Sequence, residues 1–419
     1  MEGCDFESFP AGGQLSVARS LIKFFGDSLA LVGMSSRDEP VGQWFRKEIQ
    51  GTSYWFFPVC RRNVSAKKPF IPARLTFYLG LQRYRRRILS LGCRYALTQA
   101  PEVLLPVSRW GLESLCYMFP GVENPLRISR YRLARKLCPL FDRLLFSALD
   151  RVSVILACAD ENAIGRFVAS SKGRIARERI VQVPTCVDLA EFRPVSIQES
   201  RARLGIPCNS SVFVTSGRIG RFKGWELLLD AFAVFQRKFP DSLLIFVGDG
   251  EDRPLVEAAI AARELGSRVK ITGFERPSEV SCYLNAADVV LFGSLAEGWS
   301  VAMLEALACG KPIVSTPVSG VNEMIIPRKN GFVVQTRDPA EYANAMESAL
   351  TLRDVEGFST AIADRFSLTR LGERLGRLWS PLDVGSVQAD PMDMSVSDSL
   401  PESKAVPTIA TAPEFAKQP

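Results

Sequence analysis

The sequence predicts an α/β protein built from two doubly wound domains, each with a parallel sheet covered by helices. Continuous apolar runs alternate with helical patterns between residues 211 and 350, as expected for strands that are buried on both faces. Near the start, a glycine loop is followed by a helical pattern from Leu15 to Phe25 and the apolar run Ser28–Val32, which is the opening of a second such unit. A chain of 419 residues is long enough for two domains.

The second half of the chain shows the more regular pattern. Its expected strands are residues 211–215, 242–247, 269–272, 289–292, 312–315 and 331–334, and its expected helices are 225–239, 253–265, 277–286 and 300–308. In the first half, strands are expected at 54–59, 103–107, 153–158 and 180–184. Residues 1–8 leave almost no room for the strand that should precede the glycine loop, so the start is expected to be either atypical or trimmed.

These patterns divide the chain into four parts. Residues 1–192 form a basic N-terminal domain, and residues 193–362 form the C-terminal domain. Residues 363–382 contain a helix, Leu368–Leu378, whose leucines recur every three or four positions, so that one face can pack back on the N-terminal domain. Residues 383–419 are rich in Pro, Ser, Asp, Ala and Thr, a composition that predicts a disordered tail.

Composition excludes several classes of protein. The chain has no histidine, the commonest general base and metal ligand, so any catalysis must use other groups. Its ten cysteines include no pair at the spacing of a metal knuckle and are expected to be buried, reduced thiols of a cytosolic protein. No apolar run is long enough for a membrane span, and the N-terminus lacks the pattern of a secretory leader. We therefore expect a cytoplasmic protein.

Positive charge is concentrated in the N-terminal domain. Residues 1–150 hold 22 Lys and Arg against 12 Asp and Glu, which gives this part +10 within a total of +7. The densest stretches, 83–87 and 127–136, interleave Arg with Leu, Ile and Tyr. Such segments suit an anionic membrane surface, where each basic residue contributes about 1 kcal/mol, and they equally suit a solvated helix face. Nucleic acid is not expected, since no zinc-finger spacing or aromatic RNA-binding motif accompanies the charge.

The strongest candidate site follows the expected strand 211–215. Residues 216–224, S-G-R-I-G-R-F-K-G, place Arg218, Lys223 and several glycines between a strand and a helix. Ligands of an open parallel sheet bind beyond the carboxyl ends of its strands. Glycines such as Gly217 let the backbone approach a diphosphate, while the two cations neutralise its charge. The segment therefore predicts a diphosphate clamp.

A second candidate is the segment 297–312, E-G-W-S-V-A-M-L-E-A-L-A-C-G-K-P. Gly298 opens a helix whose first N–H groups can bind an anion, and Gly310 and Pro312 end it. Glu305 lies on an otherwise apolar helix, where a carboxylate is costly unless it meets hydroxyl groups or a cation. It is interpreted either as a ligand of ribose hydroxyls or as half of a buried ion pair with Arg or Lys.

Two further loops are weak signals on their own. G-D-G at 248–250 follows one strand, and T-G-F-E-R at 272–276 follows another and can place the ring of Phe274 against a base. Each loop is also explained as a plain connection between a strand and a helix.

Taken together, these motifs resemble one known family. Residues 211–350 are similar to the nucleotide-binding half of the retaining GT-B glycosyltransferases with an E-x7-E motif, the glycosyl transferases group 1 or family 4, which include many bacterial polysaccharide enzymes. The resemblance rests on G-R-I-G-R-F-K-G, V-G-D-G, A-A-D-V-V-L-F-G-S-L-A-E-G-W-S-V-A-M-L-E-A-L-A-C-G-K-P-I-V, N-G-F-V-V and the V-D-x3-F-x-P segment at 187–194. It implies the GT-B architecture, in which two Rossmann-like domains face a central cleft.

The resemblance also implies roles for individual residues. Arg218 and Lys223 would bind the diphosphate. Glu305 would bind the ribose hydroxyls, and Glu297 would bind the transferred sugar. The other implied donor contacts are Gly217, Gly298, Trp299, Ser300, Val301 and Phe274. No metal and no other cofactor is expected, because the two cations take the place of a metal ion.

One departure limits the resemblance. Members of the family usually carry a histidine near the reacting carbon, and the corresponding stretch here is 126–131, L-R-I-S-R-Y, so either Ser129 or Arg130 substitutes or the contact is missing. Gly12 and Gly13 match the family's N-terminal glycine loop. We therefore expect retaining transfer from a UDP- or GDP-linked sugar to a glycan or lipid-linked acceptor, in cell-envelope or exopolysaccharide synthesis at the inner face of the plasma membrane. The alternative is a catalytically weakened relative that binds nucleotide sugar as a regulatory or partner module.

Overall fold

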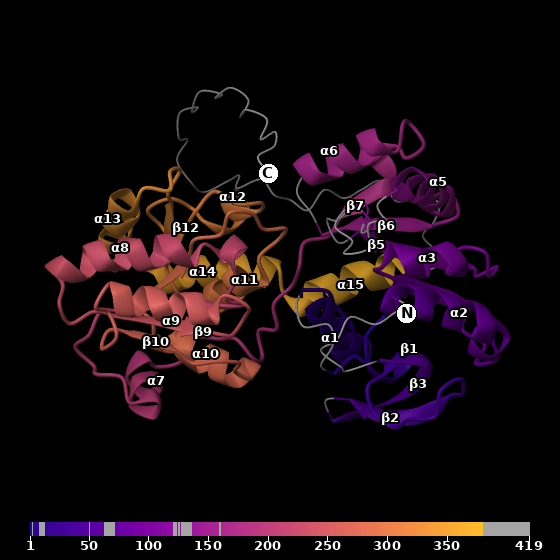
Figure 1. The fold of residues 1–419 in the computed structure, drawn as a ribbon, viewed down its shortest axis with the longest axis horizontal. Helices are drawn as coiled ribbons and strands as arrows, with labels where there is room; N and C mark the ends of the chain where they lie inside the picture. The colour runs from indigo at the N-terminus through magenta and orange to yellow at the C-terminus, as the bar shows by residue number, and fades with distance from the viewer. Residues whose placement is uncertain are drawn as a thin grey trace.

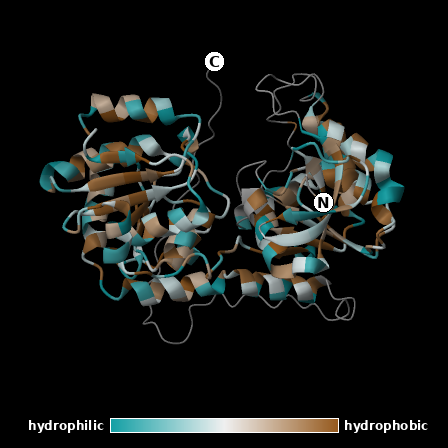
Figure 2. Ribbon diagram, turned by 90° about the horizontal axis from the view of Figure 1, so that it is seen from below, coloured by the Kyte–Doolittle hydropathy of each residue, from teal (hydrophilic) through white to brown (hydrophobic). Residues whose placement is uncertain are grey.

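A computed structural model of the chain describes residues 1–379 except 2, 8–12, 50, 63–71, 120–123, 125, 127–135 and 159–160. The protein has two lobes, and helix α15 (Leu368–Trp379) reaches from the C-terminal lobe to the N-terminal one (Figure 1). In the C-terminal lobe the strands carry mostly apolar residues, whereas the helices of both lobes carry polar and apolar residues side by side (Figure 2). The predicted α/β architecture with parallel sheets is confirmed.

The N-terminal lobe contains two sheets, with strand orders β1-β3-β2 and β4-β5-β6-β7. Its strands are β1 (Ala30–Ser35), β2 (Phe45–Ile49), β3 (Thr52–Arg61), β4 (Tyr95–Thr98), β5 (Ser114–Phe119), β6 (Val154–Ala157) and β7 (Ile180–Gln182). All neighbours pair in parallel except β2, which is antiparallel to β3 at the outer edge. The sequence predicts a wholly parallel sheet, but β2 and β3 are joined by a connection too short for a parallel crossover.

The first residues of the chain lie between these two sheets. The backbone N–H of Met34 on β1 donates to the carbonyl of Cys4 (2.8 Å), and the amino group of Met1 donates to the carbonyl of Leu97 on β4 (2.7 Å). A Cβ at Gly33 would lie 2.4 Å from the carbonyl oxygen of Cys4, so only glycine allows this approach. This segment therefore lies beside β1, where a strand before the glycine loop is expected. Its hydrogen bonds to β1 and β4 join the two sheets.

The segment 103–107, which the sequence predicts as a strand, belongs to a helix, so this prediction is wrong. Pro101 begins α3, where its missing N–H costs nothing, and Val103, Leu104 and Val107 are buried together as one face of a helical turn. A short apolar run does not reveal its own period. The helices of this lobe in the described residues are α1 (Gly13–Phe25), α2 (Ala73–Leu89), α3 (Pro101–Val107), α5 (Cys138–Leu149) and α6 (Glu161–Ser170), with 3₁₀ turns η1 (Gly26–Ser28) and η2 (Arg177–Arg179).

The C-terminal lobe is built on one parallel sheet with the order β10-β9-β8-β11-β12-β13. Its strands are β8 (Val212–Ser216), β9 (Leu243–Val247), β10 (Val269–Ile271), β11 (Val289–Phe292), β12 (Ile313–Ser315) and β13 (Gly331–Val333). Its helices are α7 (Ile197–Leu204), η3 (Arg221–Lys223), α8 (Trp225–Lys238), α9 (Arg253–Ala262), α10 (Pro277–Ala286), α11 (Val301–Ala308), α12 (Val321–Met324), α13 (Pro339–Leu350) and α14 (Val355–Arg365). Along β11, Val289 and Leu291 enter one hydrophobic core and Val290 and Phe292 the other, so both faces of the strand are covered.

Two segments connect the lobes, and they are bonded to each other. The first follows β7 and contains Val187, and the second lies between α14 and α15. The N–H of Val187 donates to the carbonyl of Phe366, and the N–H of Leu368 donates to the carbonyl of Val187, each at 2.9 Å. Helix α15 then packs against α1 of the N-terminal lobe, and its leucines share a hydrophobic core with apolar residues of that helix.

Within the described part of the chain, no helix is both long and apolar enough to cross a membrane. All ten cysteines are free thiols; Cys93 and Cys208 are exposed, whereas the others are buried or half-buried. The predicted tail, 383–419, lies outside the described residues.

Candidate functional site

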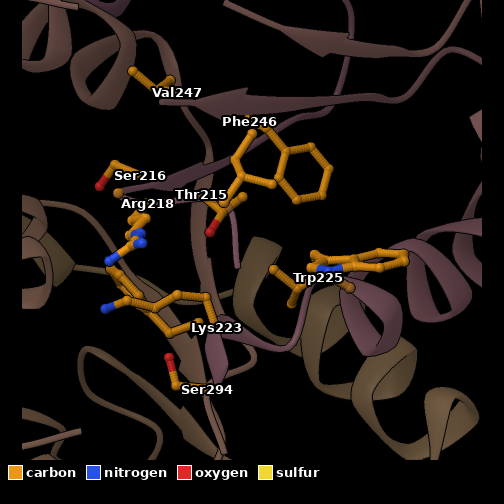
Figure 3. Close-up of a pocket in the computed structure, with 12 residues that line it drawn as sticks. Thr215, Ser216, Arg218, Lys223, Trp225, Phe246, Val247 and Ser294 are labelled. Carbon is orange, nitrogen blue, oxygen red and sulfur yellow. The ribbon is translucent and has the colours of Figure 1, made fainter. Parts of the chain in front are cut away.

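The candidate site lies at the carboxyl edge of the C-terminal sheet. From β8 the chain moves outward to β9 and β10, and from β11 it moves in the opposite direction to β12 and β13. Ligands of open α/β sheets bind at such a reversal of strand order. A pocket lies there, lined on the β8 side by residues 215–219 and Lys223 and on the β11 side by Phe292 and Ser294 (Figure 3).

Glycines bring the loops at this edge into contact. Gly224 has a φ of +67°, and a Cβ there would lie 1.8 Å from the carbonyl oxygen of Gly293, which follows β11. Gly248, after β9, has a φ of +149°, and a Cβ there would lie 1.9 Å from the carbonyl oxygen of Gly217, which follows β8. Any side chain at either position would push the loops apart, so both glycines are needed to build the pocket.

Lys223 and Glu297 form an ion pair between the loops that follow β8 and β11. Nζ of Lys223 lies 2.5 Å from Oε1 of Glu297. The same oxygen accepts a hydrogen bond from Oγ of Ser294 (2.7 Å), and Oγ1 of Thr316, directly after β12, donates to the carbonyl of Ser294 (2.6 Å). Loops after β8 and β11 therefore meet at one carboxylate, and the loop after β12 fixes the backbone of Ser294 beside it.

Arg218 lines the same pocket but pairs with a different acid. Its Nε donates to Oε2 of Glu251, in the loop after β9, at 2.7 Å. The Glu251 backbone N–H and the Arg218 guanidinium lower the pKa of the Glu251 carboxyl, which therefore stays ionised at neutral pH. Arg218 and Lys223 extend toward the same side of the pocket, and the ring of Trp225 lies at the other (Figure 3). The two cations predicted to form a clamp thus share one pocket, each already paired with a carboxylate.

Glu305, on α11, has a desolvated carboxylate. Burial raises the pKa of Glu305 from its ordinary value of 4.5 to about 8. Within the described residues, no Arg or Lys forms an ion pair with Glu305 and no donor is hydrogen-bonded to its carboxylate. The interpretation as half of a buried ion pair therefore finds no partner there. A desolvated carboxylate of this kind favours a ligand that supplies hydrogen-bond donors.

Helix α11 begins one residue after the expected start at 300 and three residues after Gly298, which therefore lies in the preceding turn and does not open the helix. Ser300 is the N-cap, its Oγ accepts from the N–H of Met303 (3.3 Å), and the helix begins at Val301. Gly298 is exposed, and a Cβ there would lie 3.9 Å from the carbonyl oxygen of Cys158, which follows β6. The turn that follows Glu297 therefore lies beside the N-terminal lobe.

The two aromatic residues predicted to contact the ligand differ in exposure. Phe274, after β10, is 82% exposed, so its ring is available for stacking. Trp299 is only 5% exposed and does not line the pocket. Its ring packs into the hydrophobic core, with its centroid 5.6 Å from that of Phe366.

Most of the residues predicted on the acceptor side lie outside the described residues. These are Gly12, Ser129 and Arg130, whereas Gly13 is the first residue of α1. Their roles stay predictions.

Three residues of the site are missing from the sequence prediction: Ser294, Thr316 and Glu251. Ser294 and Thr316 each come within two residues of the carboxyl end of a buried strand, a signal that the sequence does contain. Glu251 directly follows the G-D-G turn, but its pairing with Arg218 depends on how two separate loops meet.

Charge at the pocket comes from side chains. Among the described residues, no group of three or more Cys, Asp or Glu side chains is arranged to hold a metal ion. Arg218 and Lys223 can bind an anionic ligand directly, because charged donors make the strongest hydrogen bonds to phosphate oxygens.

Comparison with known families gives one match. Residues 196–359, which include the whole pocket described above, match the model of the family "Glycosyl transferases group 1". Two similar relatives are a D-inositol 3-phosphate glycosyltransferase of Arthrobacter sp. (strain FB24), 31% identical over 176 residues, and an alpha-D-kanosaminyltransferase of Streptomyces kanamyceticus, 31% identical over 191 residues. The matches cover 41% and 44% of this chain and 42% and 49% of these relatives, so the chain spans about half the length of each or less.

Solved structures share the whole fold. The sucrose-phosphate synthase of Thermosynechococcus elongatus superposes with a TM-score of 0.68 at 19% identity, covering 90% of this chain and 95% of its own. The Anabaena protein Alr3699/HepE, solved in complex with UDP and glucose, superposes with a TM-score of 0.65 at 18% identity, covering 90% of this chain and 97% of its own. The two lobes of this protein therefore have the GT-B fold.

Proposed function

We propose that this chain, whose residues 196–359 match the model of the glycosyl transferases group 1 family, transfers a sugar from a nucleoside-diphosphate sugar to an acceptor hydroxyl. One observation carries the proposal: Arg218 and Lys223 line a single pocket at the reversal of strand order, and the Glu297 carboxylate is paired with Lys223 at its edge. Cations aimed at one end of a ligand and a carboxylate beside them suit a diphosphate joined to a polyhydroxylated sugar. The UDP and glucose bound to the Anabaena protein of the same fold support a UDP-linked donor.

The proposed reaction assigns a role to each charged group. The acceptor oxygen forms a bond to the anomeric carbon while the bond from that carbon to the diphosphate oxygen breaks, and the acceptor proton passes to the departing phosphate. Arg218 and Lys223 stabilise the negative charge that develops on the diphosphate. Glu297 accepts hydrogen bonds from the sugar, and Glu305 accepts them from the ribose. Attack on the same face as departure gives retention of configuration, and this chemistry needs no histidine.

The acceptor is proposed to be a glycan or a lipid-linked sugar, at an anionic membrane surface. Helix α2 supports the membrane part of the proposal, because it carries no acidic residue and its exposed side chains include Arg83 and Arg86 together with Leu75 and Leu79. Exposed leucines beside arginines suit the boundary between lipid headgroups and acyl chains. The corresponding process is bacterial envelope or exopolysaccharide synthesis on the cytoplasmic side of the plasma membrane.

A donor screen tests the proposed function. Purified protein is incubated with UDP- and GDP-sugars, with and without a bacterial lipid extract, and release of nucleoside diphosphate is measured. Turnover with one donor is expected and should persist in EDTA, since Arg218 and Lys223 supply the positive charge. The anomeric configuration of the product, determined by NMR, tests retention. Tight nucleotide binding without turnover under every condition would instead support a regulatory relative that retains the pocket.

Vesicle flotation tests the membrane part separately. The protein should float with vesicles that contain phosphatidylglycerol and not with neutral phosphatidylcholine vesicles, and salt should weaken the association. Exchanging Arg83 and Arg86 for Gln should reduce flotation. Binding that is indifferent to both lipid charge and salt would remove this part of the proposal and leave the transferase activity untouched.

A further inference from the structure

The loop that carries Glu297 is attached to both segments that connect the lobes, and a single residue makes both attachments. We propose that Trp299 is a positioning residue, which sets the place of Glu297 and Gly298 according to the angle between the lobes. The inference rests on the proposed function, because it concerns the loop assigned to the transferred sugar.

The first attachment is a hydrogen bond to the segment after β7. Oγ1 of Thr185 donates to the backbone carbonyl of Trp299 at 3.2 Å, and both residues are buried. Thr185 lies two residues before Val187, whose N–H and carbonyl are bonded to the second connecting segment. The backbone of the loop that carries Glu297 is thus fixed to the point where the chain enters the C-terminal lobe.

The second attachment is made by the ring. The Trp299 ring packs against Phe366, with 5.6 Å between the centroids and 53° between the planes. Phe366 accepts the hydrogen bond from Val187 and directly precedes the return to the N-terminal lobe. On another side, a Cβ at Gly320 would lie 3.0 Å from the ring, so the ring has little room to shift.

These contacts couple two features that are separate in the sequence. Any change in the angle between the lobes bends the chain at the connecting segments, and the Thr185 hydroxyl and the Phe366 ring move with them. Trp299 is only two residues from Glu297, so displacement of its backbone displaces the carboxylate. A close-packed site has few alternative arrangements, and the displacement is therefore not absorbed locally.

A purely structural role would lead to a different expectation. Among the described residues, Nε1 of Trp299 is buried and has no hydrogen-bond partner. An unpaired buried N–H is unfavourable, so Trp299→Phe removes that penalty while it also removes part of the ring. As a core residue, Trp299 would therefore show modest effects on stability and none that is specific to transfer.

The test compares Trp299→Phe, Thr185→Val and the double variant with wild type. UDP affinity is measured by isothermal titration calorimetry, and kcat and KM are measured with the donor found in the screen. Each single variant should lose about tenfold to hundredfold in kcat, as expected for a slightly misplaced reacting group. UDP affinity should change by less than about threefold, since neither residue lines the nucleotide pocket. The double variant should be no slower than the slower single variant, because both attachments hold the same loop to two segments that are bonded to each other, and loss of either attachment releases the loop.

Trp110→Phe is the matched control. Trp110 has the same exposure as Trp299, 5%, and its Nε1 is likewise buried without a partner in the described residues, but it lies in the core of the N-terminal lobe. Its kcat should stay within about twofold of wild type. If Trp299→Phe is as active as Trp110→Phe, if it loses UDP affinity along with kcat, or if the two single effects add, the inference is overturned. A wild-type protein without turnover overturns the proposed function and this inference with it.

Discussion

Nζ of Lys223 and Oε1 of Glu297 lie 2.5 Å apart, so the cation assigned to the diphosphate and the carboxylate assigned to the sugar neutralise each other in the free protein. The Glu297 side chain is 13% exposed and that of Lys223 39%, so the carboxylate would be poorly solvated without its partner. When a diphosphate binds, Lys223 can turn to the phosphate because the donor from Ser294 still satisfies Glu297. The free site thus holds its charges in place before the ligand arrives.

Lys223→Ala is expected to abolish transfer and weaken nucleotide binding. The change removes a charged donor to the diphosphate and leaves Glu297 without its cation, and loss of one such stabilising group costs about a hundredfold to a thousandfold in kcat. Steady-state rates and UDP calorimetry measure both effects. The matched control is Lys238→Ala. Nζ of Lys238 also lies 2.5 Å from a glutamate oxygen, that of Glu347, but Lys238 is the last residue of α8, at the end of the helix away from the pocket. Unaltered transfer in Lys223→Ala would remove the clamp assignment.

Glu251→Gln is expected to increase the affinity for UDP. Glu251 competes with phosphate for Arg218, and an exposed ion pair contributes about 0.2–1 kcal/mol, so the gain should be at most about fivefold. The gain should shrink at high salt. Calorimetry at two salt concentrations measures it. Glu257→Gln, which removes an exposed partner of Arg253 instead, should leave the affinity unchanged; equal behaviour of the two variants would show that Glu251 does not compete.

Glu305→Gln is expected to make stability less dependent on pH. The folded-state pKa of Glu305 is raised from 4.5 to about 8, so the folded protein binds the proton more tightly than the unfolded chain does. The free energy of unfolding of the wild type should therefore fall as pH rises from about 4.5 to about 8, a loss that the variant avoids. Urea unfolding at pH 5 and pH 8.5 measures this difference.

The same substitution should weaken UDP binding by about twofold to tenfold, since it replaces an oxygen proposed to accept from the ribose and one hydrogen bond contributes about 0.5–1.5 kcal/mol. Glu373→Gln, at an exposed position of α15, serves as control and should alter neither property. A stability gain without any loss of UDP affinity would show that Glu305 does not contact the ribose.

Gly224→Ala is expected to destroy the pocket, whereas Gly205→Ala should not. Both glycines have nearly the same left-handed φ, +67° and +65°, so the backbone strain from an added Cβ is similar, about 1–2 kcal/mol. Only at Gly224 does the Cβ also meet the carbonyl of Gly293, at 1.8 Å, whereas nothing lies within 4 Å at Gly205. Thermal unfolding and UDP calorimetry separate the two effects. Retained UDP binding in Gly224→Ala would show that the loops need not touch.

The sequence predicts local elements well where the period is unambiguous. Helix α10 and strand β11 have the bounds expected from their patterns, because Pro277 marks the helix start and β11 is a continuous apolar run. The segment 103–107 was ambiguous because five apolar residues fit either period. The pocket cations and both glutamates follow from motif position, but the pairing of Arg218 with Glu251 and the inward turn of Trp299 depend on contacts between distant loops. No pattern within one segment contains that information.

The hydrogen bonds between Val187 and the backbone around Ser367 have a consequence for how the chain can be rearranged. The point where the polypeptide enters the C-terminal lobe and the point where it leaves are neighbours, so the C-terminal lobe begins and ends at the same place. Such a unit can be exchanged for the equivalent unit of another protein without lengthening or straining either junction. Under the proposed function, specificity for the donor can therefore change independently of the N-terminal lobe, which is proposed to receive the acceptor.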